Sequence, residues 1–133
     1  LGPLAYTLLK HTPKAKIATS LFIVSLTDMK LGFSGELALM SHLKLLVSMD
    51  SANMHLASLV GLPVISVWGA THPYAGFLGW RQSLDNVVQL DLPCRPCSIF
   101  GNRPCWRNDY ACLNEISPEE IADKIKKEIY AQK

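Results

Sequence analysis

The 133-residue sequence has no long hydrophobic run, little net charge and few cysteines, and each shortage excludes a class of protein. No apolar stretch approaches the roughly 20 residues that a membrane-spanning helix needs. A formal net charge of +2 is too small to indicate a nucleic acid partner, so none is expected. The four cysteines all lie between residues 94 and 112, unlike the spread of a secreted disulfide framework. We therefore expect a cytoplasmic protein with at most peripheral membrane contact.

The chain does contain enough apolar material for the core of one domain. Hydrophobic residues make up 49% and charged residues 18% of the sequence, which is typical of a globular protein. There are no internal repeats, no low-complexity segments and no recognisable signal peptide. The sequence begins without methionine, inside a helix-like phrase at residues 4–10. We expect residues 1–133 to be a single α/β domain, a fragment of a longer two-domain protein.

Residues 44–69 are predicted to form a strand, a helix and a second strand. The apolar run at 45–49 is typical of a strand buried on both faces. Asp50 and Ser51 follow it with oxygens that can serve the unpartnered N–H groups of a helix start. Gly61 ends the helix, and the next strand runs from there towards Gly69. One apolar helical face is predicted from four residues: Ala52, Leu56, Leu59 and Val60.

This strand–helix–strand unit implies two parallel strands with a right-handed crossover between them. Further helices are expected at residues 4–11 and 34–44, the second capped by Ser34, and a strand within 14–27. The alternation predicts a Rossmann-like α/β fold, a parallel sheet with helices on both faces. Ligands of such sheets bind beyond the carboxyl ends of the strands, where residues 50–55 and 69–71 both fall.

The second half of the chain is less regular. Residues 70–86 are predicted to be a long loop, with Tyr74 and Trp80 packing it onto the domain. A short strand is expected at 87–90, followed by a Cys-rich and Pro-rich connector at about 91–116.

The last predicted element is an amphipathic helix at residues 118–131. Ser117, Pro118 and Glu120 have the order of a capping box with proline in the first turn. The apolar face of this helix consists of Ile121, Ile125 and Ile129.

The polar turn at residues 50–55 has two interpretations. As a binding site, the helix N-terminus offers N–H groups and a positive dipole end to a diphosphate. Asp50 then accepts from sugar hydroxyls, and His55, about one turn further along, adds a donor. As an ordinary helix start, Asp50 or Ser51 caps the helix and His55 packs at its flank. Spacing alone favours the cap, whereas the position at a strand's carboxyl end favours the site.

Two motifs around this turn resemble glycosyltransferase family nine, the heptosyltransferases of the lipopolysaccharide inner core. The family usually shows Asp-Ser/Thr-Gly-x-x-His-Leu-Ala, then Gly-x-Pro-x-x-x-x-(Phe/Trp)-Gly-(Pro/Ala)-Thr-x-Pro. The Cys-x-x-Cys and the later Ser-Pro-Glu also resemble the family's C-terminal stretch. Twelve motif positions match here: Asp50, Ser51, His55, Leu56, Ala57, Gly61, Pro63, Trp68, Gly69, Ala70, Thr71 and Pro73.

The resemblance implies the C-terminal, donor-binding half of a GT-B enzyme from a Gram-negative bacterium. It implies inverting transfer of heptose from ADP-heptose to the lipopolysaccharide core, at the inner face of the inner membrane, with no cofactor required. The acceptor and the general base are then expected on an N-terminal domain, so this fragment alone is expected to be inactive. The implied donor-binding residues are Asp50, Ser51, Ala52, Asn53, His55, Gly69 and Thr71.

The sequence departs from the family pattern in two ways. Ala52 stands where the family usually has glycine, at a place where the backbone approaches phosphate. The Lys-bearing loop that helps relatives to bind phosphate has no recognisable counterpart. We expect Ala52 to be tolerated, with the exact diphosphate pose left open, and we expect the nucleotide affinity of this chain to be weak.

The connector contains two further groups of interest. Four thiols within nineteen residues can supply a tetrahedral structural zinc site, although packing thiols or disulfides formed on isolation are alternatives. The arginines Arg95, Arg103 and Arg107 are expected either to face an anionic acceptor or to lie on a solvated loop surface. The zinc interpretation also leaves an alternative function open, a non-catalytic zinc-stapled α/β interaction module. The four thiols are Cys94, Cys97, Cys105 and Cys112.

Overall fold

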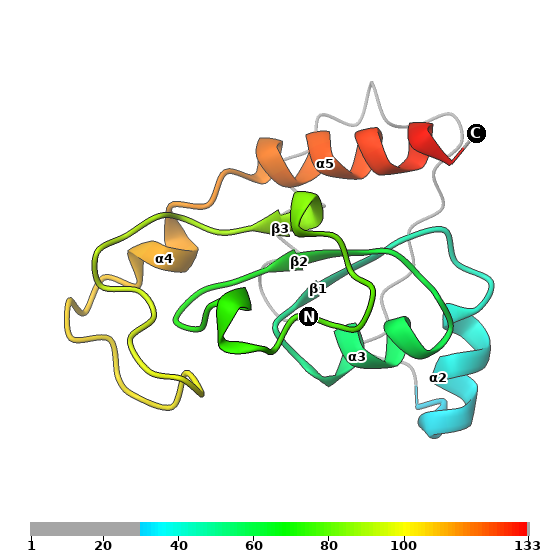
Figure 1. The fold of residues 1–133 in the computed structure, drawn as a ribbon, viewed down its shortest axis with the longest axis horizontal. Helices are drawn as coiled ribbons and strands as arrows, with labels where there is room; N and C mark the ends of the chain where they lie inside the picture. Colours follow the sequence, from blue (N-terminus) through cyan, green and yellow to red (C-terminus); the bar gives the residue numbers. More distant parts are fainter. Residues whose placement is uncertain (1–29, 133) are drawn as a thin grey trace.

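A three-stranded parallel sheet organises residues 30–132, the part of the chain that this computed structural model describes (Figure 1). The strands are β1 (Leu46–Met49), β2 (Val64–Val67) and β3 (Val87–Val88), hydrogen-bonded in the order β1-β2-β3. Both pairings are parallel, which confirms the predicted α/β class. The helix expected at 4–11 and the strand expected within 14–27 lie outside the described residues.

Helices cover both faces of the sheet (Figure 1). Helices α2 (Gly32–Met40) and α3 (Ala52–Leu59) lie on one side, and α5 (Pro118–Ala131) lies on the other. A shorter helix, α4 (Ala111–Asn114), ends the connector, and two 3-10 turns, η1 (Pro73–Ala75) and η2 (Leu84–Asn86), interrupt the predicted loop. The C-terminal helix has the predicted bounds.

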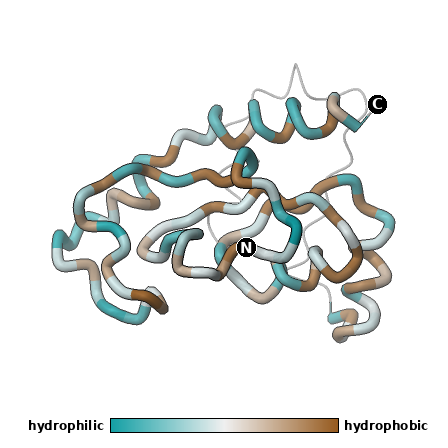
Figure 2. Tube along the Cα trace, viewed as in Figure 1, coloured by the Kyte–Doolittle hydropathy of each residue, from teal (hydrophilic) through white to brown (hydrophobic). Residues whose placement is uncertain are grey.

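The central strand β2 is buried on both faces, so its side chains divide between two apolar clusters. Val64 packs with Met54 and Trp68 on the α3 side, whereas Ile65 packs with Ile121 on the α5 side. β1 was expected to be buried on both faces as well, but its residues alternate between buried and half-buried. Figure 2 shows hydrophobic positions recurring between hydrophilic ones along α5, as its one-sided packing requires.

The predicted apolar face of α3 was half right, because Leu56 and Val60 pack against the α3-side cluster but the other two residues do not. Met54, Ala57 and Ser58 are buried, whereas Leu59 is 69% exposed and Ala52 is exposed. Hydrophobicity alone did not identify the buried face because Ser58 is buried with its hydrogen bonds satisfied. Its Oγ donates to the Met54 carbonyl at 3.1 Å and accepts from Gln82 Nε2 at 3.1 Å.

The predicted helix starts also differ from the structure. Helix α2 begins at Gly32, two residues before the expected cap Ser34, and ends at Met40, which leaves four fewer helical residues before β1 than expected. Residues 41–45 are needed outside the helix because the chain must turn back to enter the sheet. At α5, Ser117 makes no side-chain capping bond, and its Oγ instead donates to Glu119 Oε2 at 2.7 Å.

Tyr74 and Trp80 were expected to pack the 70–86 segment onto the domain, but Tyr74 is 82% and Trp80 71% exposed. Phe77 and Leu78 pack against the α3-side cluster in their place. The strand expected at 87–90 is limited to Val87 and Val88.

A glutamine fixes the 70–86 segment to the sheet. The Gln82 amide accepts from the Val64 N–H at 2.9 Å and donates to the Leu62 carbonyl at 3.0 Å, besides its bond to Ser58. Gln82 therefore provides hydrogen-bond partners for one backbone N–H and one backbone carbonyl at the start of β2, where the chain has just left α3.

We predict that Gln82→Leu lowers the free energy of unfolding by about 1–3 kcal/mol, because it leaves a backbone donor and a backbone acceptor without this partner. Urea denaturation checks this. Gln132→Leu is the control, since the Gln132 amide bonds the Lys44 carbonyl at 3.0 Å and Glu128 Oε1 at 3.5 Å at the exposed end of α5, and its cost should be about 0.5 kcal/mol or less. Equal costs for the two variants would contradict the role of Gln82.

Candidate functional site

The carboxyl ends of β1 and β2 bring the two predicted site segments together. Met49 is paired in register with Val67, so the chain leaves both strands at the same level of the sheet. The Asp50 N–H extends the ladder by one residue, donating to the Val67 carbonyl at 3.2 Å. Beyond that level, Thr71 Oγ1 donates a hydrogen bond to Asp50 Oδ2 at 2.7 Å. A carboxylate after one strand is thus held by a hydroxyl after the next.

The predicted helix cap at Ser51 does not form. Ser51 has the extended backbone of an N-cap residue, yet its side chain makes no capping hydrogen bond to α3. Its Oγ lies 3.0 Å from Ser48 Oγ, and Asp50 is engaged by Thr71. Neither side chain therefore occupies the first-turn N–H groups of α3, which carry the positive end of the helix dipole. This geometry suits an anionic ligand.

The remaining predicted donor-binding residues lie around this helix start. Ala52 and His55 are exposed on α3, and Asn53 is half-buried. Gly69 is buried, and a Cβ added to it would lie 2.8 Å from Leu113 Cδ2. Gly69 therefore allows close packing against α4, which is a different role from the predicted contact with donor.

Of the two alternatives for Arg95, the solvated loop surface does not describe it, because Arg95 is half-buried and its guanidinium turns towards the sheet. Nη2 donates to the Thr71 carbonyl at 2.9 Å and to Gln89 Oε1 at 3.1 Å. Nε donates to the Gly69 carbonyl and Nη1 to the Leu90 carbonyl. Burial lowers the pKa of this guanidinium from its ordinary value, but an arginine remains charged at neutral pH. Arg95 also lines an open hollow of about 420 Å³, with His72, Tyr74, Gln89, Asp91 and Leu92.

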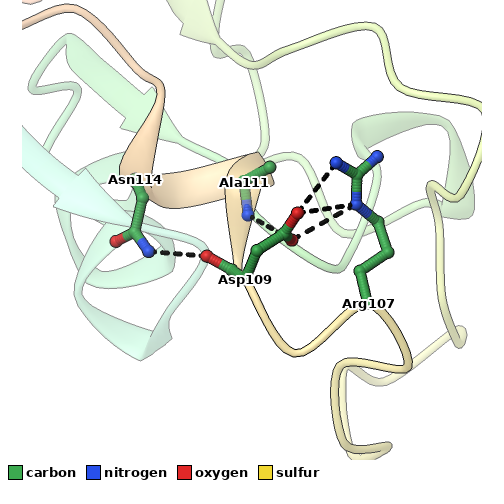
Figure 3. Close-up of polar contacts among 4 residues, drawn as sticks. All are labelled: Arg107, Asp109, Ala111 and Asn114. Atoms are coloured by element: carbon green, nitrogen blue, oxygen red, sulfur yellow. Dashed lines mark hydrogen bonds and ion pairs between the residues drawn. The ribbon is translucent and has the colours of Figure 1, made fainter.

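Arg107 is engaged within the connector (Figure 3). Its guanidinium forms an ion pair with Asp109 at 2.8 Å, and Asp109 Oδ1 also accepts from the Ala111 N–H at 3.1 Å. The hydrogen bond from Arg107, followed by that from Ala111, holds the pKa of the Asp109 carboxyl below its ordinary value. The Asn114 side chain closes the turn by donating to the Asp109 carbonyl at 2.7 Å. Arg103 and Arg107 are both exposed, although exposure alone assigns neither of them a ligand.

Two residues of this region were missed as contributors to the site. Ser48, whose hydroxyl lies beside that of Ser51, is the polar residue within an otherwise apolar strand run, and that contrast is a usable signal. Arg95 carried no such signal, because three arginines occur in one irregular segment and sequence does not distinguish the one that turns inward.

A family model described as glycosyltransferase family 9 (heptosyltransferase) matches residues 14–103, more than half of the chain. The chain belongs to glycosyltransferase family 9. Comparisons with curated proteins and with solved structures return no match. Family 9 enzymes are glycosyltransferases that use a nucleotide-sugar donor and a glycan acceptor, and the Rossmann-like sheet described above fits this function. Within residues 30–132, no helix is long and apolar enough to cross a bilayer.

The connector of this family 9 chain does not present a formed metal site. Among the described residues, no three His, Cys, Asp or Glu side chains are placed to hold a metal ion. All four cysteines are free thiols, and burial raises the pKa of both Cys97 and Cys112. The pKa of the Cys105 thiol is instead lowered, chiefly by a hydrogen bond from the backbone of Tyr110. Structural zinc remains a prediction that this geometry does not support.

We predict that iodoacetamide alkylates Cys105 before Cys97 and Cys112 at neutral pH. A lowered pKa means a larger thiolate fraction, and the thiolate is the reactive form. Peptide mass spectrometry of a time course checks the order, with Cys105→Ser as the control that removes the first adduct. Slow alkylation of all four thiols that a chelator accelerates would contradict free thiols and indicate bound metal.

Proposed function

We propose that residues 50–71 form the donor site of an inverting heptosyltransferase that takes ADP-heptose. The observation that carries this proposal is the Thr71–Asp50 hydrogen bond of 2.7 Å, placed at the carboxyl edge of the sheet beside the N-terminus of α3. One oxygen of the carboxylate is occupied by Thr71, and the other is left to accept from hydroxyls of the donor sugar. The first turn of α3 then receives the diphosphate.

The other predicted residues take supporting roles in this proposal. Ser51 and the backbone of Ala52 and Asn53 meet the diphosphate, and His55 adds a donor one turn further along α3. Their positions at and just after the start of a single helix support the assignment. Ala52 is exposed, so its methyl group points away from the packed core and adds only a small obstacle near the phosphates.

The proposed reaction is a single displacement at the anomeric carbon of the heptose. A hydroxyl oxygen of the lipopolysaccharide inner core attacks that carbon while its bond to the diphosphate oxygen breaks, so ADP leaves. A general base on an N-terminal domain accepts the proton of the attacking hydroxyl. The helix N-terminus stabilises the negative charge that develops on the departing diphosphate, and this electrostatic role requires no metal ion.

The alternative, a zinc-stapled interaction module, accounts for fewer observations. It gives no reason for a hydroxyl-held carboxylate beside an uncapped helix start at the carboxyl edge of a parallel sheet. Membership of a glycosyltransferase family also favours the enzyme.

We predict that Asp50→Asn weakens binding of ADP-heptose by roughly 10- to 100-fold, the range expected for lost hydrogen bonds to a charged group. Asparagine keeps the shape and can still accept from Thr71, so the fold should be retained. Isothermal titration calorimetry of this chain checks the affinity. Asp85→Asn, which changes an exposed carboxylate on η2, is the matched control and should bind as wild type does. Equal affinity of Asp50→Asn and wild type would contradict the role of Asp50.

A further inference from the structure

Three successive carbonyl groups follow the end of β2, and the connector supplies a hydrogen-bond donor to each of them. Arg95 Nε donates to the Gly69 carbonyl, the Cys97 N–H donates to the Ala70 carbonyl at 3.1 Å, and Arg95 Nη2 donates to the Thr71 carbonyl at 2.9 Å. Residues beyond a strand end have no ladder partners, so a turn at this place depends on donors from elsewhere in the chain.

Arg95 also ties this turn to the segment that follows β3. Its guanidinium donates to the Leu90 carbonyl and to the Gln89 side chain while it holds the carbonyls of Gly69 and Thr71. Four acceptors from two chain segments therefore converge on one planar group. A lysine cannot reproduce this, because its donors radiate from a single nitrogen at the end of a flexible chain.

The tip of the connector also approaches Thr71. A Cβ added to Gly101 would lie 3.0 Å from Thr71 Cγ2, and the Phe100 ring lies 5.8 Å from the Phe77 ring. Arg95 thus holds the carbonyl of Thr71, and Gly101 lies close to its methyl group. With its β-branched side chain restricted to few rotamers, the place of its hydroxyl follows from the place of its backbone.

We infer that Arg95 is a positioning residue for the donor-binding carboxylate. It fixes the backbone of Thr71, whose hydroxyl in turn orients Asp50 through the 2.7 Å hydrogen bond. This inference rests on the proposed donor site at Asp50. Because hydrogen bonds weaken steeply with distance and angle, a small movement of the turn is enough to release the carboxylate.

The test compares ADP with ADP-heptose in calorimetric titrations of this chain. Arg95→Ala should weaken ADP-heptose binding by about 10-fold, whereas ADP, which lacks the sugar that Asp50 contacts, should change by less than about twofold. Arg95→Lys should behave in the same direction, since it keeps the charge without the planar fork. Arg103→Ala, which removes an exposed arginine from the same connector, should leave both affinities unchanged.

Thr71→Val separates positioning from general destabilisation, because it removes the hydroxyl and keeps the carbonyl bonded to Arg95. Thr71→Val alone should also weaken ADP-heptose binding by about 10-fold. The double variant Arg95→Ala/Thr71→Val should bind ADP-heptose only a little more weakly than either single variant, because both changes release the same carboxylate. Equal losses for ADP and ADP-heptose in Arg95→Ala, or losses that multiply in the double variant, would overturn the inference.

Failure of the proposed function gives a different result. If wild type binds ADP-heptose no better than ADP, or binds neither, the proposed donor site at Asp50 is wrong. The role of Arg95 in positioning a donor-binding carboxylate is then wrong as well. The effect of Arg95 on the turn at residues 69–71 is still measured by amide hydrogen exchange at Cys97, whose N–H donates to the Ala70 carbonyl. This exchange should accelerate in Arg95→Ala and not in Arg103→Ala. Unchanged exchange would show that Arg95 does not hold this turn in place, and would overturn the inference.

Discussion

The parallel pairing of β1 with β2 is the constraint on which the rest of the site depends. Its register places Met49 opposite Val67, so the polar turn at Asp50 and the turn at Gly69 leave the sheet side by side. A slip by one residue would exchange the two faces of β1 and move Asp50 away from Thr71. Such a slip is disfavoured because β1 alternates between buried and half-buried residues, and its buried residues Leu46 and Ser48 would change faces.

The same constraint creates a problem that the connector solves. A strand that ends inside the protein leaves the next carbonyl groups without ladder partners, and unpaired buried carbonyls are costly. In this chain the donors come from Arg95 and Cys97, so an irregular, Cys-rich segment becomes part of the wall of the site. The ion pair of Arg107 with Asp109 and the turn around Ala111 hold the far end of that segment. Specific polar bonds therefore hold the connector against the sheet at one end and close a turn at the other.

The features that could be predicted from sequence were those that arise from periodicity and chain order. The βαβ unit, the meeting of residues 50–55 with 69–71 and the bounds of α5 all follow from apolar runs, glycine stops and the rule for ligand positions in parallel sheets. The errors arose where a polar group finds a partner far along the chain. Ser58 is buried because Gln82, which is distant in sequence, satisfies it, and Arg95 turns inward because two strand ends offer it carbonyls. No local pattern records such partners.

The choice of a hydroxyl to hold Asp50 has a consequence for the proposed donor site. An arginine or lysine at that position would neutralise the carboxylate and compete with the helix N-terminus for the diphosphate. Thr71 instead orients the carboxylate with an uncharged donor and leaves the negative charge and the second oxygen of Asp50 for sugar hydroxyls. This arrangement places the negative carboxylate close to a bound diphosphate, and the two groups repel each other. The N-terminus of α3 offsets this repulsion, because the positive end of the helix dipole attracts both negative groups. The guanidinium of Arg95 donates to the Gly69 and Thr71 carbonyls, and it therefore supports this arrangement through the backbone of the turn.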